Sequence, residues 1–212
     1  MEKISTILSS AVPLDRENVD TDQIIPARFL KSVSREGFGL NLFQDWRCDE
    51  MGKEKMDFVL NDPRYAGSIL VAGKNFGCGS SREHAAWALY DYGFRAVVSS
   101  FFADIFRNNA LNNGLLPVQV SETFLREIFS HVKENPHREF RIDLQTQVVS
   151  IEGTPLREVF PLQAFRKSCL MNGFDTVDFL VSKREAISQY ESKSKLIKII
   201  KNEKEENSII AG

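Results

Sequence analysis

The sequence predicts an α/β fold, in which a central mixed β-sheet, part of it parallel, is flanked by helices. Residues 69–99 have the pattern of a strand, a glycine-containing loop, a helix and a second strand. Residues 121–134 carry apolar side chains at helical spacing, and residues 140–151 alternate apolar and polar residues around a polar turn. A strand–helix–strand unit, an amphipathic helix and a hairpin in one chain indicate a sheet packed against helices.

The N-terminal part is expected to form one strand over residues 3–12, which ends at Pro13. The segment that follows is polar and contains Asp20 and Asp22. These carboxylates have two interpretations: a pair for acid–base chemistry, or Asx turns that bond to the backbone and shape the loop. We favour the second, because Thr21 between them also suits a loop.

Residues 28–57 form a long stretch in which glycines and charges are scattered and no hydrophobic period is sustained. A loop of this length in a compact domain is usually functional or mobile.

The segment from 69 to 99 contains the most informative loop. Ile69–Ala72 is short and apolar, as in a buried strand. Gly77 and Gly79 allow a sharp turn, residues 85–92 favour a helix, and Gly93 is placed to end it. The loop therefore presents its polar groups at a helix N-terminus.

Ser80 allows two interpretations. With Glu83 it fits an S-x-x-E capping box, in which case its contribution is about 1 kcal/mol of stability. Alternatively, Ser80, Ser81 and Arg82 form a site for a small acid, because backbone amides and the helix dipole favour anions there and a guanidinium matches a carboxylate.

Three common motifs are excluded by their spacing. A phosphate-binding Walker loop requires G-x-x-x-x-G-K-[ST], but Cys78 stands five residues after Gly73. A dinucleotide-binding fingerprint requires a third glycine where Arg82 stands. A nucleophile elbow requires G-x-S-x-G, but Glu83 occupies the last position.

The remaining elements follow from hydrophobic periodicity and from helix start and stop signals. We expect a helix over 102–112, a strand over 115–120, a helix begun by Ser121, a hairpin over 140–151, a helix over 161–171 closed by Gly173, and a last helix over 178–191. The side chains expected to face inward from the first of these helices are Phe102, Ile105, Phe106 and Leu111.

Four asparagines, at 108, 109, 112 and 113, form a dense cluster near the end of the helix at 102–112. They serve either capping and loop hydrogen bonds or the support of the loop at 73–82, and the sequence does not choose between the two. Arg166 either binds a substrate carboxylate or occupies an ordinary, solvated surface position.

Composition restricts the classes of function. The chain has 212 residues and a formal charge of −2, which gives no electrostatic case for nucleic acid or an anionic membrane. No apolar run approaches the roughly 18 residues of a spanning helix, and residues 1–11 do not have the pattern of a signal peptide, so a cytoplasmic protein is expected. We expect one domain over residues 1–191 and a charged, mobile tail over 192–212.

The three cysteines, Cys48, Cys78 and Cys169, are widely spaced and form neither a C-x-x-C pair nor a disulfide framework. Cys78 lies in the glycine loop, where it is either a reactive thiol activated by His84 or a small residue packed beneath the loop. We favour packing.

Residues 76–85, Phe-Gly-Cys-Gly-Ser-Ser-Arg-Glu-His-Ala, resemble the signature of the swivelling domain of the aconitase superfamily. Residues 18–27 and 102–117 resemble the two other marks of that domain. With residues 38–47, their order and spacing resemble the family of bacterial 3-isopropylmalate dehydratase small subunits, over about residues 4–190.

The resemblance implies a swivelling β/β/α domain and an interconversion of 2-isopropylmalate and 3-isopropylmalate by loss and return of water. It implies Ser80 as catalytic base and Ser81 and Arg82 as substrate-binding residues, with supporting roles for Asp20, Thr21 and Asp22. It further implies that this chain binds no cofactor and no metal, and that a large partner subunit carries a [4Fe-4S] cluster.

Two questions stay open at this stage. Single-chain relatives have a further catalytic arginine before the first motif, where Pro13 falls here, and neither Arg16 nor Arg28 is assigned to that role. Citramalate or homoaconitate is an alternative substrate, and residues 28–47 are expected to decide which of the acids is bound.

A rival function from another class is a non-catalytic anion-binding module, which would bind its ligand tightly without a partner.

Overall fold

The computed structural model describes residues 1–31 and 37–193. The chain forms two compact units, Met1–Gly173 and Phe174–Gly212. The described part of the second unit consists of α7 (Thr176–Ser182) and α8 (Arg184–Lys193). The boundary expected at residue 191 stays a prediction, and the expected tail lies outside the described residues from 194 onward.

A four-stranded parallel sheet forms the centre of the first unit. Its strands, in the order β2-β3-β4-β5, are β2 (Ala11–Leu14), β3 (Ile69–Ala72), β4 (Ala96–Ser99) and β5 (Leu116–Gln119). Nearly all of their residues are buried, as is usual for parallel strands covered on both faces.

The antiparallel strands form a second sheet. Its order is β1-β6-β7-β8, with β1 (Thr6–Ser9), β6 (Phe140–Asp143), β7 (Val148–Ile151) and β8 (Arg157–Val159). The predicted hairpin is confirmed as β6 and β7, which pair Phe140 with Ile151. The short third strand β8 was not predicted, because its three residues alternate exposed and half-buried and give no apolar signal.

The single strand expected over residues 3–12 is wrong, because the chain changes sheet at Ser10. The hydroxyl of Ser10 donates to the carbonyl oxygen of Ala66, and the backbone of Gly67 lies directly against Ser10. Pro13 does not end the strand but lies inside β2. The absence of its N–H is tolerated there because β2 is an edge strand.

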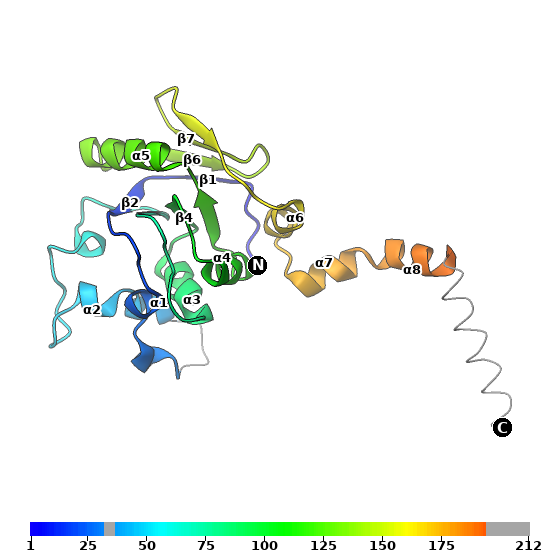
Figure 1. The fold of residues 1–212 in the computed structure, drawn as a ribbon, viewed down its shortest axis with the longest axis horizontal. Helices are drawn as coiled ribbons and strands as arrows, with labels where there is room; N and C mark the ends of the chain where they lie inside the picture. Colours follow the sequence, from blue (N-terminus) through cyan, green and yellow to red (C-terminus); the bar gives the residue numbers. More distant parts are fainter. Residues whose placement is uncertain (32–36, 194–212) are drawn as a thin grey trace. The chain divides into compact units, whose positions relative to one another are not determined.

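Helices cover both faces of the parallel sheet. Figure 1 shows α3 (Glu83–Tyr92) and α4 (Asp104–Asn112) on one side, and α5 (Glu122–Glu134) with the antiparallel sheet on the other. The α/β class and the β/β/α layering are therefore confirmed. The side chain of Ser121 accepts a hydrogen bond from the Phe124 amide, which confirms it as the cap of α5.

Two helix predictions need correction. Ile105 of α4 was expected to face inward but is 51% exposed, because it comes one residue before the buried Phe106 and so faces another direction. The helix expected over 178–191 is two helices, since Asp175 and Asp178 form a capping box that begins α7 earlier and the chain breaks at Lys183. By contrast, α6 (Ala164–Asn172) ends at Gly173 as predicted.

The connection between β2 and β3 contains only short elements in its described parts. They are α1 (Thr21–Ile24), η1 (Ala27–Phe29), η2 (Phe38–Asn41), α2 (Gln44–Arg47) and η3 (Val59–Asn61). Two contacts anchor this connection: the Gly39 amide donates to Asp91 Oδ2 of α3 at 2.7 Å, and the buried Arg47 donates to Asn61 Oδ1 at 3.2 Å.

Candidate active site

The three sequence motifs meet at the carboxyl end of the parallel sheet. The loop after β3, residues 73–82, bonds through its backbone to the segment after β2 on one side: Gly77 donates to Val19 O at 2.8 Å. On the other side it bonds to the segment after β4, where the Phe76 amide donates to Phe101 O at 3.1 Å. The carboxyl end of a sheet in α/β proteins is where ligands usually bind.

Two glycines let this loop fit between its neighbours. Gly77 has a φ of +76°, and a Cβ there would lie 2.2 Å from Cγ of Phe106 in α4. Gly79 has a φ of +89°, and a Cβ there would lie 2.2 Å from Oδ2 of Asp20. Both the backbone conformation and the close contacts require glycine, as the sequence predicted for the turn.

The predicted capping box at Ser80 is wrong. Helix α3 begins at Glu83, its N-cap is Arg82 in an extended conformation, and no side chain caps it. The reason lies in the neighbouring segment: Thr21 Oγ1 donates to the Ser80 carbonyl oxygen at 2.9 Å, three residues before Glu83, where the helix begins. The side chains of Ser80 and Ser81 are exposed.

Arg82 is held by α1. Its guanidinium Nη1 donates to Asp22 Oδ1, and its side chain is 15% exposed. Asp22 is held in turn by the N-terminus of α1, where Asp20 Oδ1 accepts from the Asp22 amide at 2.7 Å. Asp20 forms a capping box with Gln23, so its carboxylate bonds to the backbone as the Asx-turn interpretation predicted, but the carboxylate of Asp22 accepts from the Arg82 side chain instead.

Thr21 completes this set, since its amide donates to Cys78 O at 2.8 Å and its hydroxyl to Ser80 O. Asp20, Thr21 and Asp22 therefore each contact the glycine loop or Arg82. The structure brings all six predicted site residues together at one edge of the sheet.

Cys78 is half-buried in the glycine loop. Burial raises the pKa of its thiol, and the nearby charge of Asp20 raises this pKa further. A raised pKa disfavours the thiolate, which is the nucleophilic form. The structure therefore agrees with packing rather than nucleophilic chemistry. His84, the activating residue considered, packs among aromatic rings, 4.5 Å from the Trp87 ring centre and 5.6 Å from that of Phe38.

Glu83 makes contacts that the sequence did not predict. Its Oε1 accepts from Asn113 Nδ2 at 2.9 Å, at the end of α4, and from Trp87 Nε1 at 3.3 Å. One member of the asparagine cluster thus bonds to the first turn of α3, and Asn112 Oδ1 accepts from Arg166 at 2.7 Å. No local sequence pattern indicates the contact between Asn113 and Glu83, because these two residues are 30 positions apart.

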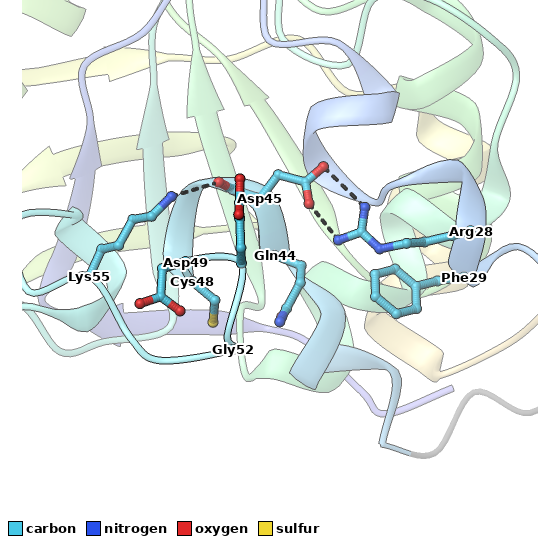
Figure 2. A pocket seen from close by; sticks show the side chains of 9 residues that line it. Arg28, Phe29, Gln44, Asp45, Cys48, Asp49, Gly52 and Lys55 are labelled. Atoms are coloured by element: carbon cyan, nitrogen blue, oxygen red, sulfur yellow. Dashed lines mark hydrogen bonds and ion pairs between the residues drawn. The ribbon is translucent and has the colours of Figure 1, made fainter.

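A charged cavity of about 670 Å³ opens beside η1 and α2 (Figure 2). Arg28 and Asp45 form an exposed ion pair in it, and Lys55 Nζ donates to the Asp45 carbonyl oxygen at 3.1 Å. The hydrogen bond from Arg28 lowers the pKa of Asp45. None of the residues that line this cavity belongs to the loop at 73–82.

The two arginines left unassigned by the sequence have different surroundings. Arg28 is paired with Asp45, whereas the guanidinium of Arg16 lies over the Trp46 ring, 4.6 Å from its centre. Arg16 lies two residues after the carboxyl end of β2, and its carbonyl oxygen accepts from the Gly73 amide at 3.0 Å.

Within residues 1–31 and 37–193, no group of three His, Cys, Asp or Glu side chains is arranged to hold a metal ion. Cys48 and Cys78 carry free thiols, and Cys169 is buried. These described cysteines therefore do not form the thiolate set that an iron–sulfur cluster requires. No helix of this part of the chain is long and apolar enough to span a membrane.

Comparison with known proteins supplies relatives over most of the chain. Residues 1–123 match the family model described as the Aconitase C-terminal domain. The chain is 60% identical to the 3-isopropylmalate dehydratase small subunit of Cytophaga hutchinsonii, over 94% of this chain and all of that one. The corresponding subunit of Christiangramia forsetii is 58% identical, over 91% of this chain and 94% of that one.

A solved structure is also similar. The crystal structure of 3-isopropylmalate dehydratase from Methanocaldococcus jannaschii superposes with a TM-score of 0.61 at 26% identity, covering 87% of this chain and 99% of that chain.

Proposed function

The chain belongs to the Aconitase C-terminal domain family and, within it, to the 3-isopropylmalate dehydratase small subunits, and we propose that its residues 76–85 form one side of that enzyme's active site. The chain is a subunit of a hydro-lyase of leucine biosynthesis. The reaction interconverts 2-isopropylmalate and 3-isopropylmalate by removal and return of water.

Such a reaction makes three chemical demands. A base removes a proton from the carbon beside a carboxylate, cationic and N–H groups bind the carboxylates, and a Lewis acid assists the departure of hydroxide. A serine hydroxyl serves as base only where its alkoxide is stabilised, because a free hydroxyl is a very weak acid.

We assign the base to Ser80 and substrate binding to Ser81 and Arg82. The observation that carries this assignment is that Ser80 is exposed three residues before Glu83, the first residue of α3, without capping that helix. The helix end and the neighbouring guanidinium favour negative charge at this point, both on an alkoxide and on a substrate carboxylate.

Asp20, Thr21 and Asp22 act as supporting residues in this proposal. Thr21 fixes the backbone of Ser80, and Asp22 holds the guanidinium of Arg82 through one of its five donors, which leaves the others for a substrate carboxylate. Asp20 places α1 against Gly79. The three side chains would thus hold the site in place before the substrate arrives.

The missing Lewis acid is proposed to come from a large partner subunit that carries a [4Fe-4S] cluster, since the described residues here offer no metal-binding group. The name "small subunit" of the relatives supports a partner of this kind. We place the enzyme in the cytoplasm, in line with its biosynthetic role and with the free thiols of Cys48 and Cys78.

The relatives' names favour isopropylmalate over citramalate and homoaconitate, the two alternative substrates that the sequence left open. Residues 28–47, part of which line the cavity in Figure 2, are proposed to discriminate among their side chains.

The test is Ser80→Ala in the complex with the large subunit. Loss of a general base lowers kcat by about 100- to 10,000-fold, and stability should be unchanged because Ser80 caps no helix. Ser121→Ala is the matched control: it removes the cap of α5 and should cost about 1 kcal/mol of stability, while kcat is retained.

Normal turnover by Ser80→Ala would refute the assignment of the base. Turnover by the purified chain without a partner would refute the shared site. Tight binding of phosphate or of the dicarboxylate by this chain alone would favour an anion-binding module instead.

A further inference from the structure

Arg82 and Glu83 are neighbours of opposite charge, and the fold directs them to different partners. Arg82 bonds to Asp22 on α1, from the segment after β2. Glu83 bonds to Asn113, at the end of the helix after β4. Two adjacent side chains at the start of α3 are therefore held by the two segments on either side of the loop.

The amide of Asn113 is well suited to fix a carboxylate. Asn113 is 8% exposed, and its Nδ2 donates to Asn109 O at 2.8 Å as well as to Glu83 Oε1 at 2.9 Å. Its Oδ1 accepts from Trp87 Nε1 at 3.0 Å. Both donors and the acceptor of the side chain are used, which sets the orientation of the amide.

The position of the Glu83 carboxylate matters because of what lies beside it. If that carboxylate turned toward the loop, it would compete for the Arg82 guanidinium and repel an incoming dianion. The hydrogen bonds to Asn113 and Trp87 keep it on the α4 side of the helix.

We propose that Asn113 is a positioning residue for substrate binding: it holds the Glu83 carboxylate away from Arg82, so that the guanidinium stays available to a substrate carboxylate. This inference depends on the proposed role of Arg82. It assigns a function to one member of the asparagine cluster that extends beyond the ordinary capping of α4.

The test is the steady-state kinetics of Asn113→Ala in the complex with the large subunit. The loss of a hydrogen bond to a charged group should raise KM about tenfold, with kcat within about threefold of the wild type. Adding Glu83→Gln to this variant removes the negative charge and should return KM to within about threefold of the wild-type value.

A purely structural role of Asn113 predicts a different pattern. The loss of packing would lower kcat as well, and Glu83→Gln would not restore KM; that result would overturn the proposal. Glu83→Gln alone is nearly isosteric and should fold even if Asn113→Ala does not. It should keep KM within about twofold, and a rise as large as that of Asn113→Ala would also overturn the proposal.

Trp87 provides a readout that does not depend on activity. The chain has two tryptophans, so Trp46→Phe leaves Trp87 as the sole indole. Asn113→Ala should then shift the emission of Trp87, whose N–H loses the nearer of its two acceptors, Asn113 Oδ1, and keeps Glu83 Oε1. Ser80→Ala is measured in parallel. If kcat falls strongly in Ser80→Ala but KM is unchanged in Asn113→Ala, only the positioning role of Asn113 is overturned. Normal turnover in Ser80→Ala overturns the proposed function.

Discussion

The backbone of Gly79 lies against the carboxylate of Asp20, so closely that a Cβ on residue 79 would stand 2.2 Å from Oδ2. The same carboxylate caps α1. The turn that presents Ser80 and the helix that carries Asp22 therefore fit together only when residue 79 has no side chain.

Gly79→Ala should destabilise the chain and lower its activity. Two costs add: a left-handed conformation costs a non-glycine residue about 1–2 kcal/mol, and displacement of Asp20 weakens a cap worth about 1 kcal/mol. Gly153→Ala is the control, since Gly153 has a φ of +77° but nothing within 4 Å of an added Cβ. Urea unfolding should show the larger loss for Gly79→Ala; equal losses would mean that Asp20 moves without cost.

Cys78 should react slowly with iodoacetamide at pH 8, because burial and the charge of Asp20 raise the pKa of its thiol and keep it protonated. Asp20→Asn keeps a good helix cap and removes the charge, so labelling of Cys78 should become faster. The measurement uses a chain in which Cys48 and Cys169 are replaced by serine. Asp22→Asn is the control, and an equal acceleration there would contradict the assigned cause.

Phe106→Ala should be far more damaging than Ile105→Ala, although the two residues are adjacent in α4. Phe106 is 1% exposed and packs 5.2 Å from the ring centre of Phe76, beneath Gly77, so its truncation should cost about 3–5 kcal/mol. Ile105 is half-exposed and should change stability by about 0.5 kcal/mol or less. Thermal unfolding of both variants checks this; similar losses would argue against the observed orientation of α4.

Arg28→Ala should cost less than about 1 kcal/mol at pH 7, because its ion pair with Asp45 is exposed. The hydrogen bond from Arg28 lowers the pKa of Asp45, so the pair's contribution is complete above the unfolded carboxyl pKa of about 4 and is lost as the pH falls through the lower folded value. Urea unfolding at pH 7 and below pH 4 should show the difference between variant and wild type shrinking. A difference that grows in acid would contradict this account.

The same variant tests the cavity in Figure 2 for substrate selection. Arg28→Ala should change the ratio of kcat/KM between isopropylmalate and citramalate. Arg64→Ala removes an exposed guanidinium from another ion pair, with the half-buried Asp62, outside this cavity and should leave that ratio unchanged. If the ratio of kcat/KM values is the same in Arg28→Ala as in Arg64→Ala, Arg28 does not discriminate between the two substrates.

Much of the fold could be predicted because the signals are local. The strand at Ile69–Ala72, the helix that Gly93 ends, the cap at Ser121 and the hairpin of β6 and β7 each depend on residues that are near one another in the sequence. The division into two sheets could not be predicted, because the change at Ser10 depends on Ala66 and Gly67, more than fifty residues away.

The candidate site, too, has a part that the local sequence predicts and a part that only the tertiary structure decides. Sequence alone identified Ser80, Ser81 and Arg82 as a group, since they are consecutive and follow a glycine turn. Where α3 begins was decided by the tertiary structure: Thr21 bonds to Ser80 O, Asp22 to Arg82, and Asn113 to Glu83. A helix starts where its first amides and side chains find their best hydrogen-bond partners. Here tertiary packing brings those partners from two segments that are distant in the sequence. The local S-x-x-E pattern at Ser80 therefore does not form a capping box.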